Sequence, residues 1–392
     1  MSFSGPLLLI GLLGLSSVVP FQLRAQSAPT STGQSNPHPF AAKFQPLVDN
    51  HTLAGAVCLV ATKDRILDEE AIGYADLETK KPMSFDNEFW IASMTKPMTA
   101  TALMMLVDEG KVKIDDPVEN YLPEFKGQTV SGSKDEPPVP ANHPILVREI
   151  LSHTSGMVNL PERPVPGTLA LHVQSYSESP LGAQPGTHFL YANANINTAG
   201  RIVEVVSGMP YEKFMQERIF TPLGMNDTTF QPDAAQMERL ASSYFEAPDK
   251  NGLVKGMSPL LPRPGKPLLP PMPAGGLFST AADLLKFCRM MLQGGVYDGK
   301  RYLTEASLAA MTKACTTPAT GGSYGLGWMI ASNGFLHDGA YKTRMAIMPR
   351  EGLVEIFLVQ QQGPIPEAVK QSMKLFSDTA EAVFGKAQPP AP

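Results

Sequence analysis

Hydrophobic and polar positions divide the chain into strand-like ends and a helix-like middle. Near the N-terminal end, two apolar runs at 53–62 and 66–74 lie on either side of the polar turn 63–65, a pattern that predicts a β-hairpin. Further strand-like runs occur late in the chain, at 324–331, 345–349 and 353–360. We therefore expect strands from both ends of the sequence to build the same domain.

Helical periodicity dominates the middle of the chain, between proline-rich loops. A helical pattern begins at Ser93, continues through Leu106 and ends at Gly110, provided that Pro97 lies in its first turn. Further helical patterns follow at 147–151, 194–206, 211–219, 284–292 and 365–384. Seven prolines in 257–273 exclude a regular element there, so that segment is either the ordered wall of a cleft or a surface loop.

This distribution predicts an α/β fold in which a mainly helical segment interrupts one domain. We place the discontinuous α/β domain at 40–110 and 276–386, and the helical domain with its proline-rich loops at 111–275. A cleft between two such units is a natural position for a binding or catalytic site.

The N-terminal residues have the pattern of an export signal. An apolar run of about 13 residues at 7–19 is too short to span a membrane but is typical of a signal-peptide core. Ala25-Gln-Ser27 follows as a small-x-small cleavage pattern. We therefore expect a signal peptide at 1–27, a linker at 28–39 and a periplasmic or secreted protein without a later membrane span; an uncleaved N-terminal anchor is the alternative.

Charge and cysteine usage exclude several classes of function. The 32 Lys and Arg residues against 37 Asp and Glu residues leave a net charge of −5, so no general basic field recruits nucleic acid. The three cysteines and seven histidines lack metal-ligand spacing, which argues against a metal enzyme. Cys58 lies in a strand-like run and Cys288 in a helical pattern, so we expect both to be buried thiols.

Ser93-Met-Thr-Lys96 is the first candidate catalytic motif. Side chains at i and i+3 share one face of a helix, so the Ser93 hydroxyl and the Lys96 amine become neighbours. A lysine that burial and the positive end of a helix keep neutral is a base for that hydroxyl. A second Ser-x-x-Lys beginning at Ser131 lies among glycine, charged and proline residues without a helix, and we discard it.

Tyr191 and Asn193 form the second candidate, at a loop-to-helix junction. A phenolate, or a tyrosine hydrogen-bonded to a neutral lysine, carries a proton between a nucleophile and a leaving group. The structural alternative is a packed Tyr191 ring with Asn193 as a helix N-cap, and the spacing alone favours this alternative.

The third candidate is His337-Asp-Gly339-Ala340, at the predicted start of an inner strand. A glycine there lets a substrate lie close to the backbone, and a strand N–H group completes an oxyanion hole. By itself the motif is equally a turn that contains a histidine.

A rival serine occurs in Gly321-Gly-Ser323-Tyr-Gly325, the Gly-x-Ser-x-Gly pattern of α/β-hydrolases. That pattern requires a strand before it, a helix after it, and an acid and then a histidine later in the chain. Here the preceding residues are loop-like and the following ones strand-like. No acidic residue separates Ser323 from His337, the only later histidine, so we discard Ser323 as a nucleophile.

The order of the three candidate motifs resembles the superfamily of class C β-lactamases, D,D-peptidases of the penicillin-binding type and family VIII carboxylesterases. The resemblance extends from about Phe40 to Phe384 and includes the segments 151–156, 222–225 and 275–280. It implies an α/β (α+β) sandwich, with a central antiparallel sheet flanked by helices and an added helical domain, and an acyl-enzyme mechanism without a cofactor.

The resemblance also implies roles for the catalytic residues. Ser93 becomes the nucleophile, while Lys96 and Tyr191 share the work of general base and then general acid. Asn193 contacts the substrate amide or carbonyl. The backbone N–H groups of Ser93 and Ala340 form the oxyanion hole.

The third motif departs from the usual family pattern. β-Lactamases and D,D-peptidases usually carry Lys-Thr-Gly there, and this cation helps to hold the substrate carboxylate. A histidine is mostly neutral at pH 7, and Asp338 adds a negative charge, so His337 and Gly339 predict weaker carboxylate recognition. The pair Lys342-Thr343 is not a displaced copy, because Arg344 stands where glycine is needed.

We therefore expect an exported serine hydrolase that acts on small-molecule esters or related acyl compounds. A β-lactamase or D,D-peptidase, acting on β-lactams or peptidoglycan peptides, is the alternative. A non-catalytic sensor or binding protein is a third possibility, but such a protein does not need Ser93, Lys96 and Tyr191 together.

Overall fold

The computed structural model describes residues 38–132, 137–159, 167–249, 252–258, 260–261, 269–316, 323–363 and 371–385, together with Met1 and Val369. The chain divides into the units Met1–Asn36 and Pro37–Pro392, and every element below belongs to the second unit. The predicted signal peptide beyond Met1, most of the linker and the lysine of the second Ser-x-x-Lys lie outside the described residues.

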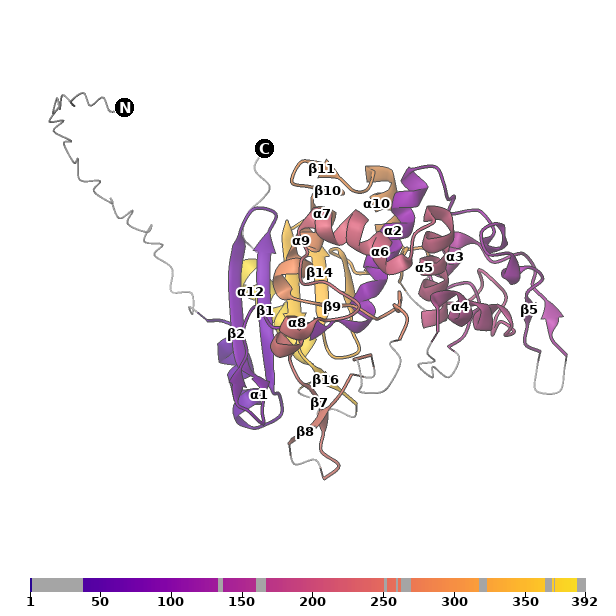
Figure 1. Ribbon diagram of the computed structural model, residues 1–392. Helices are drawn as coiled ribbons and strands as arrows, with labels where there is room; N and C mark the ends of the chain where they lie inside the picture. Colours follow the sequence, from indigo (N-terminus) through magenta and orange to yellow (C-terminus); the bar gives the residue numbers. More distant parts are fainter. Residues whose placement is uncertain are drawn as a thin grey trace. The chain divides into compact units, whose positions relative to one another are not determined.

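An antiparallel sheet forms the centre of the fold, with seven described strands in the order β12-β13-β14-β15-β1-β2-β3 (Figure 1). These strands are β1 Gly55–Thr62, β2 Ile66–Asp76, β3 Lys81–Pro82, β12 Met329–Ile330, β13 Phe335–Asp338, β14 Arg344–Met348 and β15 Leu353–Leu358. Strand β1 pairs with β2 on one side and with β15 on the other. Strands from both ends of the sequence therefore share one sheet, as the sequence predicted.

Helices cover both faces of this sheet, so β1 and β15 are buried on both sides. On one face Val57 and Ile356 pack into a core with α9 (Ala281–Leu292) and α2 (Thr95–Asp108). On the other face Cys58 and Phe357 pack against α1 (Ala41–Asp49) and α12 (Ser372–Phe384). Alternate side chains of a strand point to opposite faces, so these strands require almost continuous apolar sequence. The predicted sandwich with a central antiparallel sheet is confirmed.

Most of the remaining helices come from the middle of the chain. These helices are α3 Val147–Leu151, α4 Leu169–Ser177, α5 Asn193–Ser207, α6 Tyr211–Met215, α7 Thr221–Leu223, α8 Ala234–Arg239 and, later in the chain, α10 Glu305–Thr312. Helices α5, α6 and α10 contact α2, and α5 also packs against α3 and α4 (Figure 1). It ends at Gly208, whose φ of +70° suits a residue without a side chain. The helical turns are η1 Ala92–Met94, η2 Val118–Asn120, η3 Pro123–Phe125 and the π-helical turn η4 Gln216–Phe220.

Short strands complete the described elements. They are β4 Phe89–Trp90 with β9 Phe278–Ser279, β5 Thr129–Val130 with β6 Val139–Pro140, β10 Val296–Tyr297 with β11 Lys300–Arg301, and β7 Ser243–Glu246 with β8 Leu253–Gly256 and β16 Gln361–Gln362. The pair β4 and β9 joins the residues before Ser93 to the segment that follows Gly275. The proposed division into two domains stays a prediction.

Several boundaries differ from the sequence-based predictions. The expected strand at 324–331 is reduced to β12, because a turn occupies residues 326–328. The helix expected at 211–219 is divided into α6 and η4, and Ser93 lies in η1, before α2 begins at Thr95. His337 stands near the end of β13 and not at the start of a strand.

Two further observations concern single residues and the membrane. Cys58 and Cys288 are buried free thiols, as predicted, and Cys315 is an exposed one. No helix within the described ranges has the length and apolar character that crossing a membrane requires.

Candidate active site

Ser93 lies in a tightly held turn at the N-terminal end of α2. The preceding residue, Ala92, has a φ of +47°, a conformation that costs energy for any residue with a side chain. Backbone and side-chain hydrogen bonds hold the turn: Thr95 Oγ1 donates to Ala92 O at 2.7 Å, and Thr343 Oγ1 donates to Ile91 O at 3.2 Å. Ser93 itself stays partly exposed, so its hydroxyl is both fixed and accessible.

Lys96 is fully buried, one helical turn after Ser93, and its amine joins three segments of the chain. Its Nζ lies 2.9 Å from Ser93 Oγ, 2.9 Å from Asn193 Oδ1 and 2.7 Å from Ala274 O. Asn193 comes from α5, and Ala274 comes from the segment before β9. The i, i+3 prediction for Ser93 and Lys96 agrees with this geometry.

Tyr191 stands over the same amine. Lys96 Nζ lies 4.7 Å from the centre of the Tyr191 ring, and the Tyr191 hydroxyl is hydrogen-bonded to Ser93. Loss of solvation raises the pKa of Tyr191 to about 12, although the Ser93 hydrogen bond acts in the opposite direction. Tyr191 therefore keeps its proton at neutral pH, which favours the phenol over the phenolate considered from the sequence.

Asn193 is the first residue of α5 rather than its N-cap. Ala192 occupies the N-cap position, and its own side chain makes no capping hydrogen bond. The Asn193 side chain instead accepts the hydrogen bond from Lys96. The structural alternative for this motif, in which Asn193 caps the helix, is therefore wrong.

His337 is buried behind Tyr191, with an exposed fraction of only 1%. Its Nδ1 lies 2.8 Å from the backbone oxygen of Asp338, which only accepts, so Nδ1 carries the proton and Nε2 accepts from Tyr324 Oη at 2.9 Å. Burial, together with the nearby Lys96 amine, lowers the pKa of His337 to about 4. The prediction that this histidine is neutral at pH 7 agrees with its surroundings.

Asp338 is paired across the β13–β14 hairpin. Its carboxylate accepts from Arg344 Nε at 2.7 Å and from Arg344 Nη2 at 2.9 Å. The sequence analysis counted Asp338 as an added negative charge at the site. That charge is compensated, because Arg344 lies opposite Asp338 in the register of the two strands.

Gly339 allows the end of β13 to approach the turn that contains Ser93. A Cβ atom at this position would lie 2.0 Å from Thr343 Oγ1 and 2.5 Å from Ile91 O. The close backbone approach at Gly339 is therefore to the Ile91 turn. Ala340 follows in an exposed turn.

A sequence model described as Beta-lactamase matches residues 40–378, which include every element of this site. The chain belongs to the β-lactamase family. It is an enzyme, a serine hydrolase of that family.

Relatives and solved structures agree with this membership. Penicillin-binding protein 4 of Amycolatopsis lactamdurans is 30% identical over 334 residues, covering 81% of this chain and 83% of that protein. Esterase EstB of Burkholderia gladioli is 30% identical over 278 residues, covering 62% of this chain and 67% of the esterase. The solved structure of EstCE1, a hydrolase with promiscuous acyltransferase activity, superposes with a TM-score of 0.72 at 23% identity, covering 87% of this chain and 97% of EstCE1.

Sequence reasoning did not identify several residues of this β-lactamase-family site. The segment 151–156 entered only as a family signature, yet its His153 is fully buried against Tyr191, with ring centres 4.5 Å apart. Tyr324, which hydrogen-bonds His337, lay in the discarded serine motif. Ala274 contributes a backbone oxygen, and a backbone oxygen leaves no signal in a sequence.

The rival Ser323 lies on the surface and is followed by a turn and β12, without the helix that its motif requires. Gly321 and Gly322 of the motif lie outside the described residues. Within the described ranges, no group of three or more His, Cys, Asp or Glu side chains is arranged to hold a metal ion.

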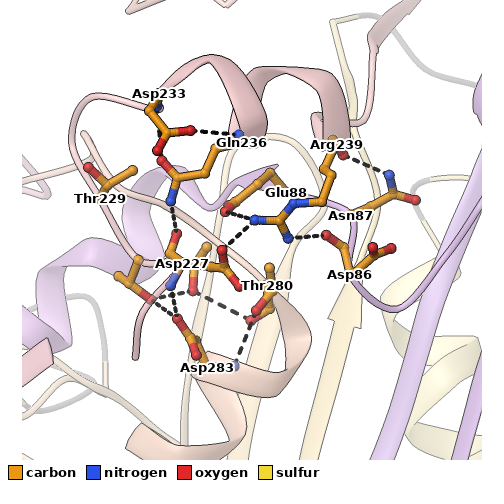
Figure 2. Close-up of polar contacts among 12 residues, drawn as sticks. Asp86, Asn87, Glu88, Asp227, Thr229, Asp233, Gln236, Arg239, Thr280 and Asp283 are labelled. Carbon is orange, nitrogen blue, oxygen red and sulfur yellow. Dashed lines mark hydrogen bonds and ion pairs between the residues drawn. The ribbon is translucent and has the colours of Figure 1, made fainter. Parts of the chain in front are cut away.

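A second charged group, here called the Glu88 cluster, comprises Glu88, Asp227, Arg239 and Asp283 (Figure 2). Glu88 directly precedes β4, five residues before Ser93, and is fully buried. Arg239 Nη2 hydrogen-bonds Asp227 and lies 3.7 Å from Glu88 Oε1. Burial, with the charge of Asp227 adding to it, raises the pKa of Glu88 to about 8.

Proposed function

We propose that this protein is an exported hydrolase of small-molecule esters that acts through an acyl-enzyme on Ser93. The observation that carries the proposal is the set of three acceptors around Lys96 Nζ. Two of them, Asn193 Oδ1 and Ala274 O, only accept hydrogen bonds. The third, Ser93 Oγ, both donates and accepts.

Because only Ser93 Oγ is able to donate, a proton can pass from Ser93 to Lys96. A neutral amine has two N–H groups and one lone pair. When the N–H groups serve Asn193 and Ala274, the lone pair faces the Ser93 hydroxyl at 2.9 Å. Lys96 then accepts the Ser93 proton as the hydroxyl oxygen bonds to the substrate carbonyl carbon.

Tyr191 completes the proton path to the leaving group. Its phenol is hydrogen-bonded to Ser93 and keeps its proton at neutral pH. As the carbon–oxygen bond to the alcohol breaks, Tyr191 donates to the departing oxygen and regains a proton from Lys96. Water then attacks the acyl-enzyme with the same two groups acting in reverse.

The oxyanion of each tetrahedral intermediate is assigned to the backbone N–H groups of Ser93 and Ala340. The support is the approach of β13 to the nucleophile turn at Gly339, which brings the neighbouring Ala340 towards Ser93. Asn193, already bonded to Lys96, is assigned a contact with the substrate amide or carbonyl.

Esters are favoured over carboxylate-bearing substrates because neither His337 nor Arg344, two basic side chains beside the third motif, is available to bind a carboxylate. His337 is neutral at pH 7, and Arg344 is bound to Asp338. Thr343 is fully buried, and its hydroxyl is occupied by Ile91 O. The kinship with an esterase supports the same choice.

A β-lactamase or D,D-peptidase is the second candidate, and Lys342 is the residue that favours it. Lys342 lies two residues after Ala340, in a turn with a φ of +64°, and is partly exposed. An ammonium group at this position is a possible partner for a substrate carboxylate.

Export is proposed from the apolar run at 7–19 and the small-residue pattern at 25–27. We expect the intact mass of the protein secreted or recovered from the periplasm to lack about the first 27 residues. Recovery of the full-length mass from the cytoplasm alone would contradict export without affecting the catalytic proposal.

The function is tested by hydrolysis of p-nitrophenyl butyrate and a chromogenic cephalosporin, side by side. We expect ester turnover that Ser93→Ala lowers by at least about 10³-fold without changing the thermal midpoint, because the hydroxyl is partly exposed. Ser323→Ala, at the rival serine, is the matched control and should keep wild-type activity. Efficient cephalosporin turnover that depends on Lys342 would replace the ester proposal by the second candidate.

A further inference from the structure

Four consecutive residues around Tyr191 are held by two residues of the loop 152–159. The backbone N–H of Leu190 donates to His153 O at 2.8 Å, and that of Ala192 donates to His153 Nδ1 at 3.3 Å. Asn159 Nδ2 donates to Tyr191 O at 3.2 Å, and Asn159 Oδ1 accepts from the N–H of Asn193 at 2.8 Å. His153 and Asn159 therefore bind the backbone at alternating positions.

We propose that His153 and Asn159 are positioning residues that hold Tyr191 and Asn193 in place around Lys96. The inference rests on the proposed function, because it assigns these two residues to the geometry of the Ser93 acylation step. The hydrogen bonds of these two residues described above go to the segment 190–193 rather than to the Ser93 hydroxyl, so each residue acts through that segment.

The hydrogen bonds of His153 determine which of its nitrogens carries the proton. Asn195 Oδ1 accepts from the Ser155 hydroxyl, so Asn195 Nδ2 faces His153 Nδ1 as a donor, at 3.2 Å. The Ala192 N–H is a second donor to the same nitrogen. Two donors exclude a proton on Nδ1, so the neutral ring carries its proton on Nε2.

Burial agrees with a permanently neutral ring. His153 has no exposed surface, and its Nε2 has no hydrogen-bond partner among the described residues. Burial lowers the pKa of His153 well below its ordinary value, and repulsion from the protonated forms of Lys96 and His337 acts in the same direction. A neutral His153 keeps its acceptor for the Ala192 N–H throughout the working pH range.

The ring and the backbone of His153 add two further constraints on Tyr191. The His153 ring packs on the Tyr191 ring with centres 4.5 Å apart, and on the Tyr324 ring at 5.0 Å. The backbone of His153 has a φ of +57°, which is unfavourable for a residue with a side chain. The bonds to Leu190 and Ala192 compensate for this strain, because that conformation directs both the carbonyl and the ring at the Tyr191 segment.

Positioning matters here because two functional side chains flank Ala192. Tyr191 is hydrogen-bonded to Ser93, and Asn193 accepts from Lys96. A shift of this segment by about 1 Å disturbs both contacts at once and costs on the order of 10²-fold in rate.

Asn159 gives the cleaner test because its side chain is exposed, so we expect its replacement to leave the fold intact. We expect Asn159→Ala to lower kcat for p-nitrophenyl butyrate by about tenfold with KM within about twofold. Asn159→Asp, which keeps the acceptor for Asn193 N–H, should restore part of the loss. Asn50→Ala is the matched control, since it removes an exposed Asn side chain bonded to Thr52 N–H far along the sequence from the site.

His153 is tested by two replacements and a double-mutant cycle. Asn tolerates the left-handed backbone and offers an oxygen to Ala192 N–H, so His153→Asn should lose less activity than His153→Ala. If His153 acts through the Tyr191 hydroxyl, His153→Ala lowers kcat by about 10²-fold in the wild type but by less than about threefold in Tyr191→Phe. If His153→Ala lowers kcat by the same factor in the wild type and in Tyr191→Phe, His153 has only a structural role and the proposal is overturned.

The rate at which an alkyl fluorophosphonate labels Ser93 tests the positioning role of His153 and Asn159 separately from the proposed ester hydrolysis. This probe reports nucleophile activation without requiring the natural substrate. Slower labelling in Asn159→Ala and His153→Ala, with wild-type thermal midpoint in Asn159→Ala, supports positioning even if no tested ester is turned over. Ser93-dependent labelling and ester hydrolysis that are unchanged in both variants would refute positioning and leave the proposed function intact.

Discussion

The Ser93 site and the Glu88 cluster occupy opposite ends of the short segment 88–96, and they contain buried charge in different ways. Lys96 directs its amine at a hydroxyl, an amide oxygen and a backbone oxygen, all of them neutral. Glu88 lies instead beside Arg239, which also binds Asp227 (Figure 2). An ionisable group among neutral partners is able to exchange a proton, whereas an ion pair such as that of Arg239 with Asp227 holds a structure together.

Hydrogen bonds around Glu88 connect the segment before β4 to the residues at the end of α8. Glu88 N–H donates to Arg239 O at 3.0 Å, and Ala241 N–H donates to Glu88 O at 2.9 Å. Asn87 Nδ2 donates to the same Arg239 oxygen at 2.7 Å, and Arg239 Nη1 donates to Asp86 O at 2.7 Å. The cluster thus attaches the strand that leads to Ser93 to the end of α8. The comparison predicts that changes at Lys96 affect activity and changes at the cluster affect stability.

The largest effect is expected for Lys96→Met. This change removes the base, so ester hydrolysis should fall by at least about 10³-fold. The thermal midpoint should move by only about 3 °C or less, because relief from burying an amine offsets the two acceptors left without a donor. Activity of purified, folded protein and calorimetry check both parts.

Lys286→Met is the control for Lys96→Met, since Lys286 is a partly buried lysine bound to Asp283 and to Gly224 O. It should keep its activity within about threefold. A Lys286 variant as inactive as the Lys96 variant would remove the distinction between the two regions.

Arg239→Met should act in the opposite sense. Without the guanidinium, Asp227 and Glu88 lose their positive neighbour, and the free energy of unfolding should fall by about 2 kcal/mol. Activity per folded molecule should change by less than about threefold. Urea unfolding measures the first quantity, and active-site titration with the fluorophosphonate normalises the second.

Arg218→Met is the matched surface control. Arg218 pairs with the partly exposed Glu109, whereas Arg239 also lies beside the fully buried Glu88, so the loss of Arg218 should cost less than about 1 kcal/mol. If the two variants lost equal free energy of unfolding, the Glu88 cluster would stabilise the fold no more than an ordinary surface ion pair does.

Glu88→Gln is expected to have the smallest effect, visible only in the pH dependence of stability. Because the pKa of Glu88 is about 8 in the folded chain and lower in the unfolded chain, the folded state binds the extra proton. The contribution of the Glu88 proton to the free energy of unfolding is therefore full below about pH 4.5 and is lost as the pH rises to about 8. Gln has no proton to lose, so the variant should gain stability relative to the wild type over that range, by about 1 to 2 kcal/mol between pH 6 and 8.

The readout for Glu88→Gln is the difference between the two unfolding free energies at each pH, since other groups such as Glu355 titrate equally in both proteins. A difference that stays constant from pH 5 to 9 would show that Glu88 is ionised at neutral pH and that Arg239 neutralises it.

Local spacing explains why parts of the site were predictable. Ser93 and Lys96 are three residues apart at the start of a helix, so one helical turn brings them together whatever the rest of the chain does. The hairpin at 53–74 was equally readable, because alternating apolar residues around a polar turn require only neighbouring strands. For Tyr191 and Asn193 the spacing favoured a structural reading, and only the family resemblance pointed to catalysis.

Other parts depended on contacts between distant residues. Asp338 was read as an uncompensated charge because its pairing with Arg344 requires the register of β13 against β14. The role of Ala274 is carried by a backbone oxygen, which every residue possesses. His153 and Glu88 were absent from the predicted site for a similar reason, since burial and left-handed backbone conformation arise only after packing.

The sequence by itself determined the strand-rich ends and the helical middle, the proximity of Ser93 to Lys96, and the family to which the chain belongs. These depend on short-range periodicity and on motifs whose residues are close together in the chain. The tertiary structure alone decided which acceptors surround Lys96, which residues hold Tyr191, and which charges are compensated. Such properties depend on distances and solvation between segments that lie up to about 180 residues apart, which no local pattern encodes.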